Sequence, residues 1–454
     1  IKKKHGLWKK FTRTKSGMVY LEYCRERNYV RSMSRKAANE LEKDIAKSAK
    51  INPKKFWMHA QSKTKVKSGI ADLQYVGEDG GTKMTASDKE KAQVLNDFFG
   101  SVYTREDASM VPQLEQLDIT YDLQTLDISE DMVLKKLKSL NVNKSPGPDK
   151  VHSRILAELK EVLASPLTLI FQQSLRLNQL PKDWKTAQIS AIFKKGKRSL
   201  PSNYRPVSLT CVVCKIMESI LRDHIIDHLK RNKLFSTKQF GFISGRSTTY
   251  QLLTVLEKWT KMLDEGIQVD VIYMDYAKAF DKVPHLRLLS KLQSYGINNE
   301  ILGWIKDFLF GRTHTVCVNG QLSSPIDVTS GIPQGSVLGP ILFVIYINDL
   351  PSLISTNAYL FADDTKLFNS IVCKEDQIQL QEDLNQTMEW SEKWLLGFNL
   401  TKCKVLTLST GEPKFKGEYK LNSSDGSSHI LEHVKQEKDI GVTIDSCLSF
   451  ESHI

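Results

Sequence analysis

The segment "YLFADDTKLF" (residues 359–368) places two adjacent carboxylates, Asp363 and Asp364, inside an otherwise apolar run. The apolar arms predict two paired strands, 359–362 and 365–368, with the two aspartates at the tip of the hairpin. Neighbouring carboxylates repel each other, and both lose solvation when they are buried. A divalent cation is the natural compensation, because it cancels the repulsion and favours the ionised form.

A second hydrophobic run, "VDVIYM" (269–274), ends directly at Asp275. Carboxylates at two adjacent strand ends would form an all-oxygen site for Mg²⁺. Such sites commonly hold two ions about 4 Å apart and promote phosphoryl transfer. We therefore predict that Asp275, Asp363 and Asp364 bind metal and take part in catalysis. The alternative is that Asp275 merely ends a strand and that the aspartate pair lies in an exposed turn.

The rest of the chain mixes helical and strand periodicity, which favours the α+β class. Helices are expected at 1–50, 52–63, 87–104, 129–141, 153–178, 211–231, 248–264, 285–310 and 376–396. Strands are expected at 188–199, 314–318, 325–328 and 404–409, with a further hairpin closing the chain. Residues 105–128 have the composition of a linker, and a domain boundary is expected near 115.

The positive charge is concentrated at the N-terminus. The chain has a net charge of +12, yet residues 1–67 alone hold 20 Lys and Arg against 5 Asp and Glu. The same segment carries the aromatic residues Trp8, Phe11, Tyr20, Tyr23, Tyr29, Phe56 and Trp57. This combination suits a polyanion such as RNA or DNA. The alternative is a solvated helical surface with a few core aromatics.

No apolar run approaches the roughly 18 residues of a membrane span, so no membrane association is expected. The start "IKKKHGLWKKF" shows no signal peptide, and its first residue, Ile, suggests a piece of a longer reading frame. Seven dispersed cysteines favour reduced thiols and an intracellular site. Cys211 and Cys214 have no second pair at zinc spacing, so no structural zinc is expected.

An ordered set of motifs resembles one family. "FADD" is similar to motif C of reverse transcriptases, and "MDYAKAFDKV" (274–283) is similar to motif A. "SGIPQGSVLGPILF" (330–343) resembles motif B of the non-LTR, LINE-type retrotransposon enzymes, with chicken-repeat-type elements as the nearest subgroup. Further resemblances follow in the family's order: "KSPGPD" (144–149), "AIFKKGKRSLPSNYRPVSL" (191–209), "QFGFISGRST" (239–248), "FNLTKCKVLTLS" (398–409) and "KDIGVTIDSCLSF" (438–450). One such motif is weak evidence, whereas this ordered series is specific.

The resemblance implies a right-hand polymerase fold with fingers and palm, a basic helical N-terminal extension and a thumb that is largely missing. The expected domains are the N-terminal extension at 1–115, a linker and N-terminal motif leading into the fingers at 116–180, the reverse transcriptase domain at 174–442, and the start of a truncated thumb region at 443–454.

The resemblance also implies roles for individual residues. Phe280 matches the bulky residue that excludes a ribose 2′-OH. Arg205 matches the arginine that grips the triphosphate, and Lys194 or Lys195 matches a lysine at the same phosphates. Four further positions complete the expected site: Gln334 near the nucleotide's sugar, Gly331 and Gly335 where the backbone approaches closely, and Lys402 as proton donor to pyrophosphate, with Lys404 as the fallback. Arg246 is expected to contact template or primer phosphate, with an exposed ion pair as the alternative.

The implied function is RNA-directed DNA synthesis with two Mg²⁺ ions, an RNA template, a DNA primer or target and deoxynucleoside triphosphates. The expected locations are a cytoplasmic ribonucleoprotein and the nucleus. Two alternatives remain open at this point: a catalytically idle copy that still binds RNA, and a reverse transcriptase of the intron-maturase type.

Overall fold

The computed structural model describes residues 2–50, 52, 53, 56, 57, 59, 60, 69–77 and 80–453. The chain forms two compact units, residues 1–69 and 70–454. The predicted helix at 52–63 lies largely outside the described residues. The boundary expected near 115 falls within the second unit, because the structure divides the chain at residues 69 and 70.

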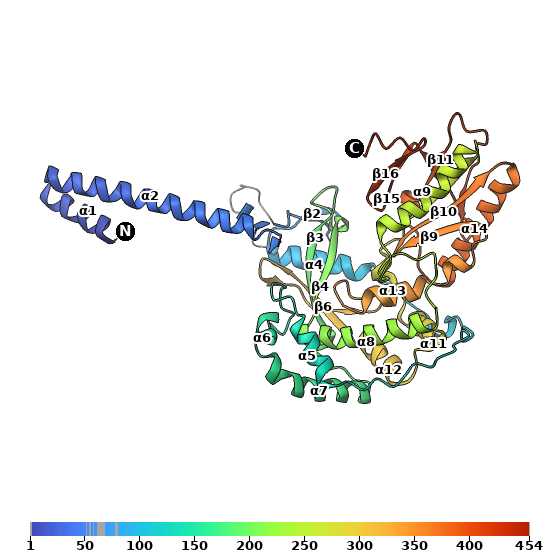
Figure 1. Cartoon of the computed structure of the whole chain (residues 1–454), viewed down its shortest axis with the longest axis horizontal. Helices are drawn as coiled ribbons and strands as arrows, with labels where there is room; N and C mark the ends of the chain where they lie inside the picture. Colours follow the sequence, from blue (N-terminus) through green and yellow to red (C-terminus); the bar gives the residue numbers. More distant parts are fainter. Residues whose placement is uncertain are drawn as a thin grey trace. The chain divides into compact units, whose positions relative to one another are not determined.

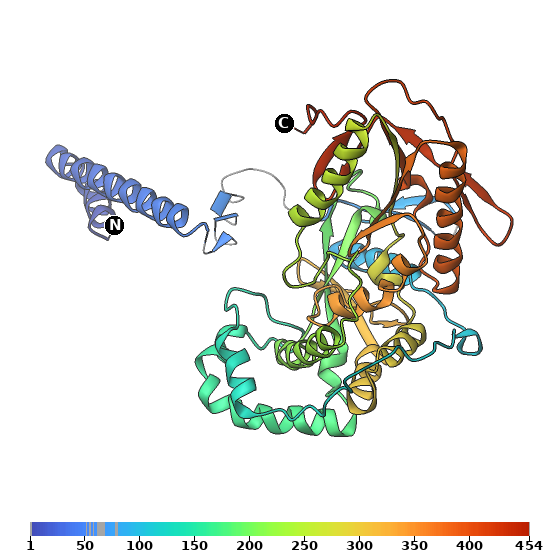
Figure 2. The same ribbon diagram turned by 45° about the vertical axis from the view of Figure 1, so that its right-hand side comes forward.

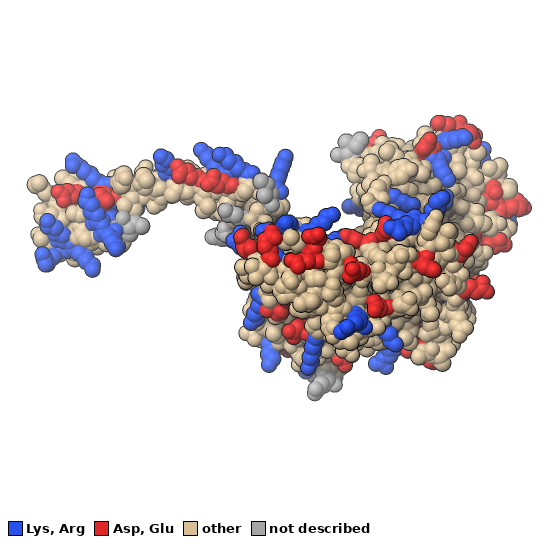
Figure 3. Space-filling view, turned by 60° about the horizontal axis from the view of Figure 1, so that its bottom comes forward, with Lys and Arg blue, Asp and Glu red and all other residues tan. Residues whose placement is uncertain are grey.

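The first unit is a pair of helices, α1 (Lys2–Thr14) and α2 (Gly17–Lys47). Their aromatic side chains pack together: the ring centroids of Trp8 and Tyr23, and those of Phe11 and Tyr20, are 4.9 Å apart. Of residues 2–47, all of them described, Ile45 alone is buried. Lys and Arg side chains are spread over the exposed surface of this helical pair (Figure 3). The helical prediction for the start of the chain is confirmed.

The second unit alternates helices and strands, which confirms the mixed helix and strand class. Its helices are α4 (Asp88–Ser101), α5 (Glu130–Lys138), α6 (Ser153–Glu158), α7 (Lys160–Leu177), α8 (Val212–Arg231), α9 (Thr248–Asp264), α10 (Ala279–Lys282), α11 (His285–Ser294), α12 (Asn299–Leu309), α13 (Gly339–Ile347) and α14 (Lys374–Lys393). Its strands are β1 (Gln74–Val76), β2 (Thr82–Met84), β3 (Thr186–Phe193), β4 (Tyr204–Leu209), β5 (Gln268–Met274), β6 (Arg312–Val318), β7 (Gln321–Leu322), β8 (Ile326–Val328), β9 (Asn357–Phe361), β10 (Asp364–Ile371), β11 (Lys404–Leu408), β12 (Lys420–Asn422), β13 (Ser428–Ile430), β14 (Glu432–Val434), β15 (Gln436–Asp439) and β16 (Val442–Asp445).

The first five-stranded sheet has the order β14-β11-β5-β10-β9. Its central strand β5 is apolar on both faces, because Val269 and Val271 join one core cluster while Ile272 and Met274 join another. Trp259 of α9 packs in the first cluster and Leu384 of α14 in the second. Helices therefore cover both faces of this sheet, and Figures 1 and 2 show α14 running alongside β9 and β10. A strand buried on both faces reads as a nearly continuous apolar run, and in "VDVIYM" Asp270 alone interrupts it.

The second sheet has the order β4-β3-β6-β7, with β8 also paired to β6. Strands β3 and β4 form an antiparallel pair, and β3 runs parallel to β6. One face packs against Leu95 and Phe99 of α4, which share a buried cluster with Ile189 and Val316. The Ser87 hydroxyl caps α4 by accepting from the Glu90 N–H at 3.2 Å.

Three segments differ from their predictions. The long helix expected at 153–178 breaks at Leu159 into α6 and α7. The helix expected at 285–310 is two helices, because the chain turns at Gly296 with a φ of +73°. The expected linker at 105–128 is bound to the body of the unit through Glu106, whose carboxylate pairs with the buried Arg287 at 2.9 Å.

Candidate active site

Strand pairing brings the predicted carboxylates to one end of the first sheet. In the antiparallel pair of β10 and β5, Thr365 lies opposite Met274, so the next residues outward are Asp364 and Asp275. Strands β9 and β10 form the predicted hairpin, but its two-residue turn is Ala362-Asp363 instead of the expected Asp363-Asp364. Asp364 is therefore the first residue of β10, opposite Phe361. The aspartates therefore lie at the ends of two neighbouring central strands.

The tip of this hairpin is held by a segment that precedes α9. The Phe240 N–H donates to Leu360 O at 2.8 Å, and Gln239 Oε1 accepts from the N–H groups of Gly241 at 2.7 Å and Ala362 at 2.9 Å. Ala362 has a φ of +55°, in the left-handed region, so the turn needs such support. Gly241 is required because a Cβ there would lie 2.3 Å from the Ala362 nitrogen.

A cavity of about 550 Å³ lies over this end of the sheet. It brings together most of the predicted site residues: Asp275, Asp363, Lys194, Lys195, Arg205, Phe280, Gln334 and Lys402 all line it. Its walls therefore combine carboxylates from the first sheet with cations from β3, β4 and their connection. Such a charge pattern suits a ligand that carries both phosphates and a metal ion.

Lys402 lies closest to the carboxylate of Asp275. Its Nζ is 2.5 Å from Asp275 Oδ2, and both side chains are partly exposed. The backbone around Asp275 is fixed by the same region, because the Asn399 N–H donates to Asp275 O at 2.7 Å and the Ala277 N–H to Gly397 O at 2.9 Å. The alternative lysine, Lys404, pairs with Glu432 instead.

The pKa values of the aspartate pair are raised. Burial raises the pKa of the Asp363 carboxyl, and the charge of Asp275 adds to this effect. Partial burial, together with repulsion from Asp363 and Asp275, raises the pKa of Asp364 to about 6. Solvent still reaches Asp364, which lines a neighbouring cavity of about 270 Å³ that Asp275 and Lys402 also border. Burial is the larger cause of both shifts, and the repulsion between carboxylates that adds to it is a cost that a bound cation would relieve.

The donor set fits a hard divalent cation, because it consists of carboxylate oxygens at partly solvated strand ends. Within the described ranges, however, no group of three or more His, Cys, Asp or Glu side chains is arranged to hold a metal ion. The ammonium of Lys402 on Asp275 and the separate cavity of Asp364 are consistent with this. Binding an ion would require these side chains to reorient.

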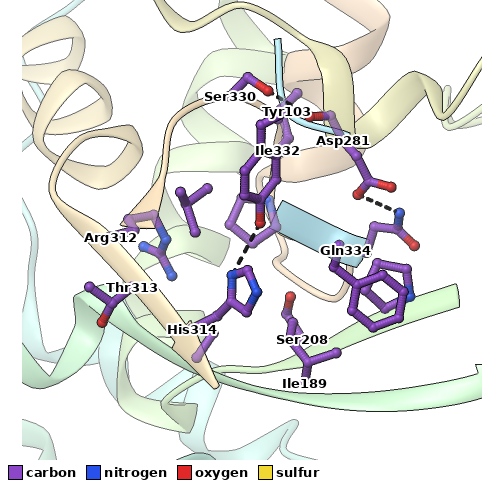
Figure 4. A pocket seen from close by; sticks show the side chains of 16 residues that line it. Tyr103, Ile189, Ser208, Asp281, Arg312, Thr313, His314, Ser330, Ile332 and Gln334 are labelled. Carbon is purple, nitrogen blue, oxygen red and sulfur yellow. Dashed lines mark hydrogen bonds between the residues drawn. The ribbon is translucent and has the colours of Figure 1, made fainter. Parts of the chain in front are cut away.

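Phe280 and Gln334 form another wall of the cavity. The ring of Phe280 stacks on Phe343 with centroids 4.6 Å apart, which fixes its orientation. The Gln334 Nε2–H donates to Oδ1 of the buried Asp281 at 2.8 Å (Figure 4). Gly335 has a φ of +121°, and a Cβ there would lie 2.6 Å from Ser208 O. This glycine lets the loop that carries Gln334 lie against β4.

Three cations of this cavity, Arg205, Lys194 and Lys195, lie on or next to the second sheet. Arg205 is on β4, opposite Ile192 of β3, and Lys194 directly follows β3 with its N–H bonded to Asn203 O at 2.8 Å. Burial lowers the pKa of Lys194, and repulsion from Arg205 adds to this. Lys194 and Lys195 both line the larger cavity, so the choice between them stays open.

Arg246 is not among the residues that line this cavity. Its Nη1 donates to Ser236 O at 2.5 Å and also to Gln239 O, so it orders the segment that holds the hairpin tip. Its contact with nucleic acid stays a prediction.

Sequence reasoning missed four residues of this site: Gln239, Lys278, Asp281 and Asn399. Asp281 and Lys278 stand within the quoted "MDYAKAFDKV", and Gln239 begins "QFGFISGRST". Lys278 lines the larger cavity with a φ of +58°, and burial lowers its pKa. Their position in the motifs was the available signal, yet the contact that each makes depends on distant segments.

In the described part of the chain, no helix is both long enough and apolar enough to cross a membrane.

Comparison with known proteins identifies the family to which this chain is similar. Residues 192–443, more than half of the chain, match the family model described as "Reverse transcriptase (RNA-dependent DNA polymerase)". The chain is 29% identical over 397 residues to the "Probable RNA-directed DNA polymerase from transposon BS" of Drosophila melanogaster, covering 82% of this chain and 42% of that protein. It is 31% identical over 353 residues to the "RNA-directed DNA polymerase from mobile element jockey" of Drosophila funebris, covering 75% of this chain and 37% of that protein.

The family match over residues 192–443 identifies a polymerase-type domain within this mixed helix and strand unit. The chain belongs to the reverse transcriptase (RNA-dependent DNA polymerase) family. The predicted resemblance to LINE-type retrotransposon reverse transcriptases is confirmed. The chain spans about two fifths of the length of these curated relatives.

Proposed function

We propose that this chain carries the catalytic centre of an RNA-directed DNA polymerase. The observation that carries the proposal is the 550 Å³ cavity in which Asp275 and Asp363 face Arg205 and Lys194. In the proposed reaction the primer 3′-hydroxyl releases its proton to solvent, and its oxygen bonds to the α-phosphorus of a deoxynucleoside triphosphate. The bond from that phosphorus to the bridging oxygen breaks, and pyrophosphate leaves with its electron pair. Names of relatives that contain "RNA-directed DNA polymerase" support this reading.

Asp275, Asp363 and Asp364 would hold two Mg²⁺ ions. Bound there, the ions would lower the pKa of the primer hydroxyl and neutralise phosphate charge. Arg205 and Lys194 or Lys195 would bind the triphosphate, since a guanidinium offers paired donors and keeps its charge. Lys402 would donate a proton to the leaving pyrophosphate.

We assign selection of the nucleotide's sugar to the wall of the cavity formed by Phe280 and Gln334. The ring of Phe280, held by Phe343, would exclude a ribose 2′-OH. Gln334 would lie beside the sugar, and its bond to Asp281 keeps the amide oriented. Gly335, which lets this loop lie against β4, would also let its backbone approach the nucleotide closely.

We further propose that the sheet containing β3, β4 and β6 belongs to the fingers and that the sheet containing β5, β9, β10 and β11 belongs to the palm. In this assignment residues 174–442 are the reverse transcriptase domain, and residues 116–180 contain the motif that precedes it. The partners would be an RNA template and a DNA primer, and the basic α1–α2 pair suits such polyanions. The proposed locations are a cytoplasmic ribonucleoprotein and the nucleus.

The test is primer extension on an RNA template with Mg²⁺, comparing the wild-type chain with Asp363→Asn. We expect the substitution to abolish extension while RNA affinity stays within about three-fold, because the carboxylate acts in chemistry rather than in template binding. The matched control is Asp264→Asn, which changes an exposed aspartate at the end of α9. No extension by the wild-type chain, or loss of RNA binding together with activity in Asp363→Asn, would contradict the proposal.

A further inference from the structure

The loop of residues 330–338 carries Gln334 into the cavity and leads directly into α13. Backbone hydrogen bonds hold the first half of this loop to two neighbouring segments. The Gly331 N–H donates to Val283 O and the Ile332 N–H to Phe280 O, both at 2.8 Å, while Gln334 O accepts from the Ser208 N–H at 2.7 Å. These bonds tie the first half of the loop to α10 and β4.

The second half of the loop is held by one side chain, Glu218, from the middle of α8. Its Oε2 accepts from the N–H of Val337 at 2.5 Å and from the N–H of Leu338 at 3.1 Å. Its Oε1 accepts from the thiol of Cys214 at 3.6 Å. Glu218 is fully buried, and every one of these partners is buried or partly buried.

The physical setting shows what offsets the cost of burying a carboxylate at this position. Leu338 is the N-cap residue of α13, and it has no side-chain oxygen to satisfy the first N–H groups of the helix. The Gly339 N–H, the first of α13, donates to Ser336 Oγ at 2.9 Å. The Glu218 carboxylate, supplied by a different helix, accepts from the two N–H groups just before α13 and lies at the positive end of its helix dipole. Burial raises the pKa of Glu218, while the two backbone N–H groups and the buried Arg312 oppose this shift.

A short and tightly turned stretch of backbone connects the N–H groups that Glu218 binds to Gln334 in the cavity. Val337 is three residues from Gln334, and the Ser336 N–H bonds back to Pro333 O at 3.0 Å, which closes a tight turn. Gly335, inside that turn, already lies against Ser208. A shift of the 337–338 backbone is therefore transmitted to the Gln334 side chain and to its bond with Asp281.

We propose that Glu218 is a positioning residue for the incoming nucleotide: by clamping the N–H groups of Val337 and Leu338, it holds Gln334 where the nucleotide's sugar would lie. This inference rests on the proposed function, which places a deoxynucleotide in the cavity. Glu218 does not line the cavity and does not touch the nucleotide. Its effect is on how well the site is organised before the nucleotide binds.

The test compares Glu218→Ala, Glu218→Gln and the wild-type chain in single-nucleotide extension on an RNA template. For Glu218→Ala we expect the KM for the deoxynucleotide to rise at least about ten-fold with kcat within about three-fold, and discrimination against ribonucleotides to fall. Glu218→Gln keeps one acceptor oxygen, so its KM should lie between that of the wild-type chain and that of Glu218→Ala. The matched control is Asp227→Asn, on the same helix, where an exposed carboxylate pairs with Arg231 at 2.9 Å.

A second measurement does not depend on activity. Hydrogen–deuterium exchange of residues 331–341 should be faster in Glu218→Ala than in the wild-type chain, with unchanged exchange in β5 and β10. Unchanged exchange in this loop would overturn the clamp. Faster exchange with an unchanged KM and unchanged sugar discrimination would overturn the positioning role, as would a joint loss of kcat, RNA affinity and thermal stability in both Glu218 variants. If the wild-type chain extends no primer, the proposed function fails, and the exchange comparison still decides whether the clamp exists.

Discussion

The Nζ of Lys402 lies 2.5 Å from Oδ2 of Asp275, at the edge shared by the two cavities over the first sheet. The ammonium therefore pairs with an oxygen atom that a divalent cation would need as a ligand. In the proposed function, binding of a cation and release of Lys402 would then be linked events. The freed ammonium would remain in the same cavity, where a leaving phosphate needs a proton.

Replacing Lys402 by Met separates two expected effects of its ammonium, which are competition with the cation for Asp275 and donation of a proton to the leaving phosphate. We expect kcat for primer extension to fall by about 10²–10⁴-fold, the usual contribution of a general acid. The Mg²⁺ concentration for half-maximal activity should fall at the same time, because the competing cation is gone. A Mg²⁺ titration of extension rate measures both. Lys404→Met is the control, since Lys404 pairs with Glu432; equal effects of the two substitutions would contradict the assignment.

Asp364 should destabilise the protein when it is ionised. Its pKa of about 6 is above the usual value for aspartate, so the penalty grows as the pH rises from about 4 to 6 and is complete above that range. Asp364→Asn should therefore raise the free energy of unfolding at pH 7.5 by about 1 kcal/mol, a figure reduced because solvent reaches this group. At pH 4 the gain should vanish. Urea unfolding without Mg²⁺ at both pH values provides the test, and equal effects at the two values would contradict it.

Phe280→Ala should relax the choice of sugar. Removing the ring opens space beside the nucleotide, so the preference for deoxynucleotides over ribonucleotides should fall by about ten- to a hundred-fold. Single-nucleotide kcat/KM values for the two sugars measure this. Phe280→Tyr keeps the ring and should keep the preference. An unchanged preference in Phe280→Ala would show that another residue selects the sugar.

Gly241→Ala should disturb the aspartate hairpin from outside the cavity. The added Cβ would lie 2.3 Å from the Ala362 nitrogen, so the turn carrying Asp363 must move. Extension activity should fall at least about 100-fold, because small misplacements of reacting groups are costly. The free energy of unfolding should fall by about 1–3 kcal/mol. Gly411→Ala, where nothing lies within 4 Å, is the control. Wild-type activity in Gly241→Ala would contradict the support assigned to this segment.

Arg287→Ala should release the segment that follows α4. The guanidinium pairs with Glu106 at 2.9 Å and donates to Met110 O and Lys393 O, each at 3.0 Å. Removing one partner of a buried pair should cost about 3–5 kcal/mol of unfolding free energy. Arg231→Ala, at an exposed ion pair, should cost about 0–1 kcal/mol. Urea unfolding of both variants gives the comparison, and similar losses would contradict a structural role for the Glu106 pair.

The sequence predicted the centre of the fold well because its signals there are local. An apolar run before Asp275 and a two-residue turn between apolar arms were enough to place the ends of β5, β9 and β10 within three residues. The same reasoning put Asp275 and Asp363 at neighbouring strand ends. It missed the break between α11 and α12, where one glycine with positive φ ends a strongly helical pattern.

The contacts that could not be predicted join distant segments. Glu106 and Arg287 are 181 residues apart, and Glu218 and Val337 are 119 residues apart. No periodicity in these segments encodes their partners. Residues 105–128 therefore have the composition of a linker, and nothing in the sequence distinguishes Glu218 from any other glutamate in a helix. The pairing of Lys402 with Asp275 and the separate cavity of Asp364 likewise follow from tertiary register.

Residues 73–99 supply half of a core. Leu73, Ala92, Leu95 and Phe99 are buried together with Ile189, Tyr204, Val316 and Val318 of the second sheet. A recombinant fragment designed from the motifs alone would begin near residue 116 and would leave that face of the sheet exposed to water. Such a fragment should aggregate on expression, whereas one that begins near residue 70 keeps the cluster whole.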